Sequence, residues 1–206
     1  MPKQKRDLNA IYISERLQES LRPILRCALT TVVAPMGYGK TTAVNWYLGE
    51  RAKAGPLCVI RVSVYSNNLA IFWRSAQDAF ARAGFPFLRD CACPADAAGS
   101  GLLVEDLCRE LGGEVPCCIF IDDFHLLTDG RLSAFLCTLA NRLPDNVHLI
   151  VASRDRFLPG EEILRLGRKV CQIGTEQLRL NHTELSVYAH RCGADLSDAQ
   201  IDALLY

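Results

Sequence analysis

Residues 34–42, Ala-Pro-Met-Gly-Tyr-Gly-Lys-Thr-Thr, combine the residue types that bind phosphate groups. Two glycines allow backbone N–H groups to turn towards phosphate oxygens. The ammonium of Lys40 would reach the β- and γ-phosphates of a nucleotide, and the hydroxyl of Thr41 would bind Mg²⁺. We therefore interpret this segment as a nucleotide-binding loop. Its candidate binding residues are Gly37, Tyr38, Gly39, Lys40, Thr41 and Thr42.

The segments on either side of the loop fit this interpretation. The apolar run Leu29–Val33 predicts a short buried strand, and Val44, Tyr47 and Leu48 have the spacing of a helix. A phosphate-binding loop requires a strand before it and a helix after it, whose N-terminus adds partial positive charge. Ala34 stands where the strict pattern has glycine. The alternative is an ordinary strand–turn–helix whose lysine is only solvated.

Two carboxylates follow a second buried strand. Cys117–Ile121 is continuously apolar, and Asp122 and Asp123 come directly after it. Ligands in open α/β sheets bind outside the carboxyl ends of the strands, so both side chains should lie beside the loop. Asp122 is the candidate Mg²⁺ ligand, largely through water, and Asp123 the candidate group that orients or deprotonates water. Alternatively, the pair only ends the strand as a turn or helix cap.

A third strand, Val147–Ala152, ends in Ser153 and Arg154. A guanidinium at that edge can donate two parallel hydrogen bonds to phosphate oxygens. Arg154 is thus a candidate contact for the γ-phosphate. The alternative is a surface arginine paired with Asp155 or Asp122.

Composition narrows the function classes. The 206 residues carry 23 basic and 23 acidic side chains, which argues against a nucleic-acid surface along the whole chain. No apolar stretch approaches 18 residues, so we expect no transmembrane helix. Most of the ten cysteines lie in apolar runs, as reduced thiols do in a cytoplasmic protein. Cys91 and Cys93 lack a second ligand pair, and the four histidines, interpreted as structural or exposed, show no ligand spacing.

The remaining patterns predict an α/β chain in which a helical tail follows a nucleotide-binding domain. We expect strands at 57–64 and 169–173, helices at 69–83, 102–111, 130–143 and 159–166, and a loop at 85–101. Pro23 should break or kink an early helix. Capping signatures at Asn181 and Ser197 open two further helices. We assign 1–180 to the nucleotide-binding domain, with 1–13 a flexible lead-in, and 181–206 to the truncated beginning of a helical lid.

The order of these motifs resembles the nucleotide-binding domain of MalT-like, large LuxR-type transcriptional regulators, P-loop ATPases of the STAND class. The resemblance covers roughly residues 11–206 and rests on three segments: residues 34–42, the Asp-Asp-Phe-His strand end at 122–125 and the Ala-Ser-Arg strand end at 152–154. It implies a P-loop NTPase fold, with a mainly parallel five-stranded sheet in the order 5-1-4-3-2 and helices on both faces. The strand of Arg154 would then separate the strand of Asp122 from the loop strand.

The resemblance also implies ligands, partners and residue roles. ADP would occupy a resting state and ATP with Mg²⁺ an active one. The partners would be downstream winged-helix and sensor domains, with DNA bound only through a domain absent here and self-association driven by ATP; a membrane is not among them. Lys40 and Thr41 would bind phosphate and Mg²⁺, with Asp122 as metal ligand, Asp123 as its catalytic neighbour and Arg154 as γ-phosphate sensor. Near the adenine, the family places residues that correspond to Ile11, Ile13 and Arg16. Met36 departs from the small residue usual at its position.

Two functions remain open from the sequence. The first is a nucleotide-dependent switch with slow hydrolysis, because Phe124 rather than glutamate follows the aspartate pair and no arginine finger is evident. The second is a free-standing P-loop ATPase or small-molecule kinase, which would turn over steadily and need an acceptor site. A degenerate fold kept for protein interaction is disfavoured, since Lys40, Thr41, Asp122 and Asp123 are all present.

Overall fold

The computed structural model describes residues 11–94 and 96–205, and for residues 97 and 98 it describes the backbone only. The expected lead-in at 1–13 therefore lies mostly outside the described residues. Within them, five strands form one sheet in the order β2-β3-β4-β1-β5, and every strand pair is parallel. The strands are β1 (Leu29–Val33), β2 (Cys58–Ser63), β3 (Cys117–Asp122), β4 (Val147–Ser153) and β5 (Val170–Ile173). The predicted fold and strand order are confirmed.

The register places the predicted polar strand ends together. Leu149 of β4 pairs with Leu29 of β1 on one side and with Ile119 of β3 on the other. β4 therefore lies between the loop strand and the strand of Asp122, as expected. Because all strands run the same way, the loop after β1 and the ends of β3 and β4 meet at one edge.

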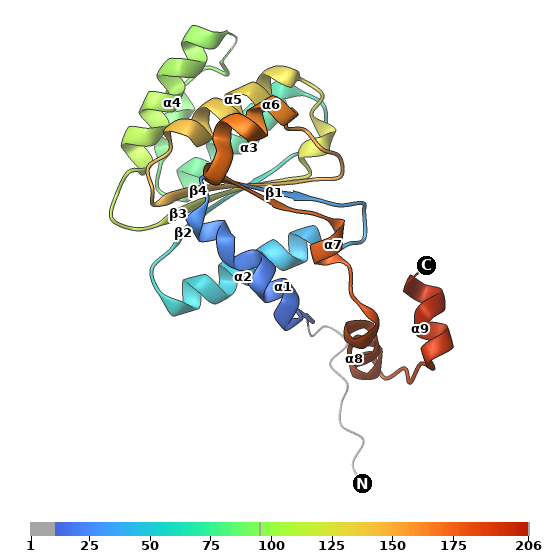
Figure 1. The fold of residues 1–206 in the computed structure, drawn as a ribbon. Helices are drawn as coiled ribbons and strands as arrows, with labels where there is room; N and C mark the ends of the chain where they lie inside the picture. The colour runs from blue at the N-terminus through green and yellow to red at the C-terminus, as the bar shows by residue number, and fades with distance from the viewer. Residues whose placement is uncertain (1–10, 95, 206) are drawn as a thin grey trace.

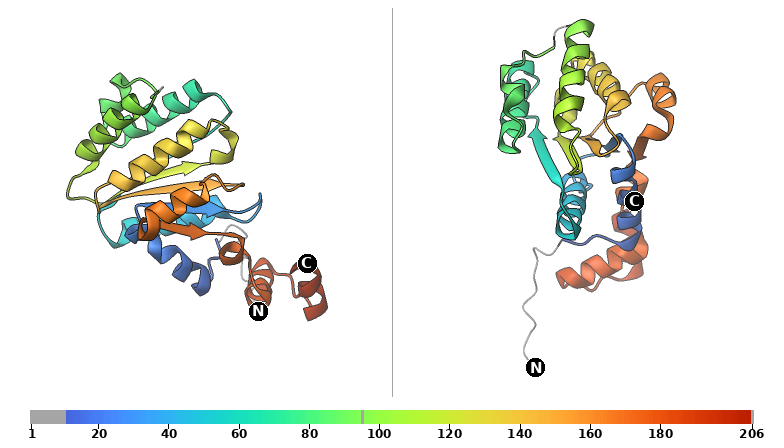
Figure 2. Two further views of the ribbon diagram at one scale, coloured as in Figure 1. Left: turned by 45° about the horizontal axis from the view of Figure 1, so that its top comes forward. Right: turned by 90° about the vertical axis from the view of Figure 1, so that its left-hand side faces the viewer.

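Helices cover both faces of the sheet (Figures 1 and 2). In the view of Figure 1, α3, α4, α5 and α6 lie above the sheet and α1, α2 and α7 below it. The helices are α1 (Glu15–Leu21), α2 (Lys40–Ala54), α3 (Leu69–Arg82), α4 (Ala97–Leu111), α5 (Gly130–Arg142), α6 (Gly160–Leu166), α7 (Thr175–Leu178), α8 (His182–Cys192) and α9 (Asp198–Leu205), with 3-10 turns η1 (Arg22–Arg26), η2 (Pro86–Asp90), η3 (Phe124–Leu126) and η4 (Gly167–Lys169).

The two faces of the sheet carry two separate apolar clusters. Ile119 and Ile121 of β3 pack with the upper helices, whereas Cys118 and Phe120 pack with α1, α2 and α7. Successive strand residues point to opposite faces, so a strand buried on both faces reads as one continuous apolar run. This explains why Cys117–Ile121 showed no alternation in the sequence.

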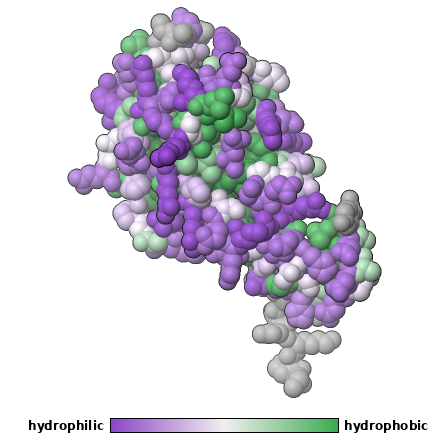
Figure 3. Space-filling model, in the orientation of Figure 1, coloured by the Kyte–Doolittle hydropathy of each residue, from purple (hydrophilic) through white to green (hydrophobic). Residues whose placement is uncertain are grey.

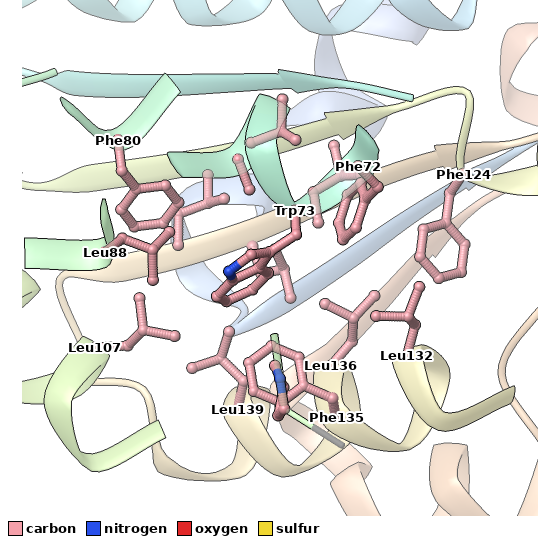
Figure 4. A pocket seen from close by; sticks show the side chains of 16 residues that line it. Phe72, Trp73, Phe80, Leu88, Leu107, Phe124, Leu132, Phe135, Leu136 and Leu139 are labelled. Atoms are coloured by element: carbon pink, nitrogen blue, oxygen red, sulfur yellow. The ribbon is translucent and has the colours of Figure 1, made fainter. Parts of the chain in front are cut away.

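A small apolar cavity of about 50 Å³ remains in the upper cluster, where Trp73 and Phe135 lie between α3 and α5 (Figure 4). None of the predicted site residues lines it. Figure 3 shows a green apolar patch among hydrophilic side chains on that side of the molecule.

The loop predicted over 85–101 was wrong. Residues Pro86–Asp90 form η2, and α4 begins at Ala97 rather than at Leu102. Asp96 starts the helix early, because its side chain accepts a hydrogen bond from Gly99 N at 2.8 Å. Burial of Leu103 and Leu107 against the core then outweighs the weak helix propensity of the glycines in the first turns.

The two predicted C-terminal capping signatures form. Asn181 and Glu184 exchange hydrogen bonds of 2.8 and 2.9 Å at the start of α8, and Ser197 and Gln200 make the equivalent pair before α9. Both helices extend away from the sheet, beside the phosphate-loop end of the molecule (Figure 1). Among the described residues, no helix has the length and apolar character needed to cross a bilayer.

Candidate functional site

The loop after β1 has the backbone of an anion-binding site. Gly37 and Gly39 adopt φ values of 88° and 73°, and α2 begins at the next residue, Lys40. Positive φ is accessible to glycine at no steric cost, and it turns the peptide N–H groups inwards. Ala34, which replaces the first glycine of the strict pattern, is 1% exposed. A methyl group therefore fits at this position.

We expect Gly39→Ala to lower the free energy of unfolding by about 1 kcal/mol, because an L-residue is strained at φ 73°. Gly49→Ala, in the middle of α2, is the matched control. A Cβ there meets nothing within 4 Å, so it should stabilise by about 0.5–1 kcal/mol. Urea unfolding of both variants would measure the difference, and equal changes would contradict the strain.

Hydrogen bonds hold the ammonium of Lys40 against the backbone of the preceding loop. Its Nζ donates to the carbonyl oxygens of Ala34 at 2.7 Å and Pro35 at 2.9 Å, and the residue is 9% exposed. Burial lowers the pKa of Lys40, and the charges of Asp123, Arg154 and Asp122 also act on it. The structure thus brings Lys40, both aspartates and Arg154 into one electrostatic cluster.

The two aspartates at the end of β3 have different environments. Asp122 is half-buried; burial raises the pKa of its carboxyl, and hydrogen bonds with Thr41 and the N–H of Asp123 oppose this. The Asp123 N–H donates to Asp122 Oδ1 at 3.0 Å. Asp123 itself has φ 58°, an uncommon conformation for an aspartate, and its side chain is 53% exposed. Asp122 is therefore held next to Thr41, while Asp123 faces open space.

Arg154 is exposed at the end of β4, and its Nη2 lies 3.6 Å from Sδ of Met36 in the loop. Of the residues that the structure describes, neither Asp155 nor Asp122 forms an ion pair with it. The preceding Ser153 is fully buried, and its hydroxyl forms no hydrogen bond within the described part of the chain. The guanidinium therefore has donors left for a ligand.

A cavity of about 840 Å³ opens beside the loop. Most of its lining comes from three places: the segment before α1, the loop with the start of α2, and the helices and connecting chain after β5. Tyr12 and Tyr188 stack across it with ring centroids 6.0 Å apart, and the guanidinium of Arg191 lies 4.8 Å from the Tyr12 ring. Its loop and α2 residues are Met36, Gly37, Tyr38, Gly39, Thr42 and Ala43.

The three residues expected near the adenine occupy different places. Ile11 and Ile13 line this cavity, so an apolar surface stands next to the phosphate loop. Arg16 lines a neighbouring cavity, and its side chain forms hydrogen bonds with other parts of the protein. Its guanidinium donates to both carboxylate oxygens of Glu184, at 3.0 and 2.8 Å, and to the carbonyls of Glu176, Gln177 and Arg179.

We call this set of bonds the Arg16–Glu184 clasp. It uses all five N–H donors of the guanidinium and joins α1 to the start of α8. Glu184 is 8% exposed, and the hydrogen bond from Arg16 lowers the pKa of its carboxyl to about 2. Ser14, which caps α1 by accepting from Leu17 N at 3.2 Å, also lowers the pKa of Glu184. One network therefore fixes two walls of the cavity relative to each other.

These residues fit a nucleoside phosphate and Mg²⁺. The cavity lining combines apolar and aromatic side chains with Gly37 and Gly39 of the loop. The ammonium of Lys40, the residue after Gly39, is held by the carbonyl of Ala34. Thr41, which lowers the pKa of Asp122, and Asp122 itself carry oxygen ligands of the kind Mg²⁺ prefers. In this arrangement Lys40 would bind phosphate, and Thr41 and Asp122 would hold the metal ion.

Sequence reasoning missed part of the cavity. Tyr12 fell in the expected lead-in and Tyr188 in the C-terminal helical segment, and nothing in the sequence showed that their rings would stack. Glu184 was identified as a helix cap, but its ion pair with Arg16 has no local signal. His125, interpreted as structural or exposed, lies beside Asp123 with a side chain that is 8% exposed.

Comparison with known proteins finds sequence relatives among transcriptional regulators. No family model matches the chain. It is 25% identical over 178 residues to the HTH-type transcriptional regulator MalT of Yersinia pestis (strain Pestoides F) and to that of Yersinia pseudotuberculosis serotype O:1b. These matches cover 86% of this chain and 20% of each relative, so the chain spans about a fifth of their length.

A solved structure supports the fold. The crystal structure of Cdc6p from Pyrobaculum aerophilum superposes with a TM-score of 0.52 at 17% identity, covering 93% of this chain and 52% of that one. The chain is therefore similar in sequence to MalT over most of its length, and it has the fold of a P-loop NTPase.

Proposed function

We propose that this chain is the ATP- and ADP-binding switch of a signal-responsive transcriptional regulator, with slow Mg²⁺-dependent hydrolysis. The observation that carries the proposal is the cluster at the sheet edge: a buried Lys40 ammonium at the N-terminus of α2, next to Asp122, Asp123 and Arg154. The likeness to MalT supplies the regulatory context. Residues 1–180 would form the nucleotide-binding domain, and 181–206 would begin a lid over it.

Each group has a distinct proposed role. Gly37–Thr42 bind the phosphates, Asp122 and Thr41 hold Mg²⁺, and Asp123 orients the attacking water. The adenine would lie against Ile11 and Ile13 at the apolar end of the cavity. Hydrolysis should be slow, because Phe124, buried and packed on Phe157 with centroids 4.7 Å apart, follows the aspartates where a glutamate would activate water.

The switch needs more than one phosphate contact. Moving a two-state equilibrium from mostly off to mostly on requires a difference of about 5 kcal/mol. A charge-assisted hydrogen bond from Arg154 to the γ-phosphate supplies about 1.5–3 kcal/mol of this. The remainder would come from contacts of the lid and of downstream domains, since α8 and the chain before it line the same cavity.

Calorimetric titration tests the proposal. The wild-type chain should bind ADP and Mg²⁺–ATP with micromolar or tighter affinity, and turn over slower than about once per minute, against ~1–100 s⁻¹ for kinases. Arg154→Ala should weaken ATP binding about 10- to 100-fold and leave ADP binding within about twofold, because only ATP carries the γ-phosphate. Arg156→Ala, an exposed arginine two residues further on, is the matched control.

The possible outcomes separate the alternatives. Equal loss of ATP and ADP binding in Arg154→Ala would contradict its role as a γ-phosphate contact. Rapid turnover by the wild-type chain would favour a free-standing ATPase or kinase. Binding of neither nucleotide would reject the proposed switch for this chain.

A further inference from the structure

The two ring nitrogens of His125 are buried and lack hydrogen bonds. The side chain is 8% exposed, yet neither Nδ1 nor Nε2 forms a hydrogen bond with any residue that the structure describes. Leaving both nitrogens unpaired in a buried place costs free energy, and native structures seldom do so without a reason. No role for this imidazole follows from the phosphate or metal contacts described above.

Backbone hydrogen bonds hold the turn that carries the imidazole ring. His125 is the middle residue of η3, bracketed by hydrogen bonds from Leu126 N to Asp123 O and from Leu127 N to Phe124 O, each 3.0 Å long. Phe124 anchors the same turn by packing on Phe157. The imidazole therefore has little freedom to find a partner by moving itself.

The nearest ionisable group is the carboxylate of Asp123. Its Oδ1 lies 3.9 Å from Nδ1 of His125, about 1 Å beyond the length of a hydrogen bond. Asp123 is the movable member of the pair, because its side chain is 53% exposed. Rotation of the carboxylate can close the gap while η3 stays fixed.

We propose that His125 is the positioning residue for Asp123: its Nδ1–H donates to Oδ1 and fixes the carboxylate towards the water that attacks the γ-phosphate. This inference rests on the proposed function, because it assigns a task to Asp123. His125 touches neither nucleotide nor metal, and it acts only through Asp123.

The surroundings of the ring favour its neutral form. Burial and the charge of Arg154 lower the pKa of His125; Lys40 acts in the same direction, and Asp123 and Asp155 oppose them. A carboxylate oxygen only accepts, so the proposed contact requires the one proton of the neutral ring to lie on Nδ1.

Three substitutions separate the two ring nitrogens. The amide nitrogen of Asn lies near the position of Nδ1, and that of Gln near Nε2, whereas Phe keeps the ring without a donor. In single-turnover hydrolysis, His125→Asn should stay within about threefold of wild type. His125→Gln and His125→Phe should be about tenfold slower or worse, which is part of the roughly 10²–10⁴-fold that general acid–base catalysis contributes. All three should bind ADP with unchanged affinity.

Thermal unfolding separates this role from simple packing. His125→Phe removes two unpaired buried nitrogens and should raise the unfolding midpoint by a few degrees while slowing hydrolysis. If His125 only packed, the hydrolysis rates of its variants would rise and fall with their unfolding midpoints. Equal rates for the Asn, Gln and Phe variants would overturn the proposal.

A spectroscopic readout does not depend on nucleotide. Imidazole ¹⁵N shifts of the nucleotide-free chain, assigned with His125→Gln, should show the Nδ1–H tautomer, and Asp123→Ala should reduce its population. An Nε2–H tautomer, or no response to Asp123→Ala, would overturn the proposal. If this readout succeeds while the wild-type chain binds no nucleotide, the His125–Asp123 pairing stands and the proposed function fails.

Discussion

Lys40→Ala should weaken binding of ADP and of Mg²⁺–ATP by at least about 100-fold, equivalent to about 3 kcal/mol. The ammonium is buried, and the carbonyls of Ala34 and Pro35 fix it at the start of α2. Phosphate oxygens that enter the loop would then meet a preorganised cation in place of water. Truncating one partner of such a desolvated charge pair costs about 2–5 kcal/mol.

The matched control lies on the same helix. Lys53 is at the C-terminal end of α2, its side chain is 76% exposed, and its recorded partner is Glu50 at 2.7 Å. Lys53→Ala should leave both affinities within about twofold, because an exposed pair contributes little. Calorimetry on both variants measures the contrast. Retained affinity in Lys40→Ala, with the variant folded by circular dichroism, would show that the loop does not bind phosphate through this lysine.

The strands of the sheet and the polar residues at their ends could be predicted from the sequence, because burial on both faces leaves a recognisable pattern. The continuous apolar runs at Leu29–Val33 and Cys117–Ile121 reflect burial on both faces, which the two core clusters confirm. Polar residues after those runs then had to lie at the carboxyl edge. Asn181 with Glu184 is a local signal, because a capping box involves residues only three apart.

Long-range contacts could not be predicted in the same way. Arg16 and Glu184 are 168 positions apart, and no periodicity links them. The resemblance placed Arg16 near the adenine, while the structure commits its guanidinium to Glu184 and three carbonyls. Helix α4 was shortened in the prediction because Ala, Gly and Ser in its first turns resemble a loop. The side-chain cap at Asp96 and the packing of Leu103 override that weak propensity.

Disruption of the Arg16–Glu184 clasp should loosen the cavity as well as the fold. Arg16→Ala leaves the carboxylate of Glu184, which is 8% exposed, without its cation. The side chain of Arg16 is 38% exposed, so we expect a loss of about 1–3 kcal/mol, between the values for exposed and buried pairs. ADP and ATP affinity should fall together, by about tenfold, because the segment before α1 and helix α8 both line the cavity.

The control for this change is Arg22→Ala. Arg22 directly follows α1 and pairs with Glu19 at 2.8 Å, but both side chains are more than half exposed. Its removal should cost less than about 1 kcal/mol and leave nucleotide affinity unchanged. Arg16→Lys should behave like Arg16→Ala, since one ammonium cannot replace five planar donors. An Arg16→Lys variant with wild-type stability would contradict the geometric basis of the clasp.

The clasp also predicts a specific dependence on pH. The pKa of Glu184 is lowered from 4.5 to about 2 in the folded chain. A depressed carboxyl pKa contributes stability that is present above about pH 4.5 and is lost as pH falls towards 2. Urea unfolding at pH 6 and pH 3 should therefore show a smaller difference in Arg16→Ala than in the wild type. Because Glu184 joins α8 to α1, acid should loosen α8 before the sheet, and hydrogen exchange at pH 3 should show α8 opening earlier than β1. Simultaneous opening of α8 and β1 would mean that the clasp does not set the stability of α8.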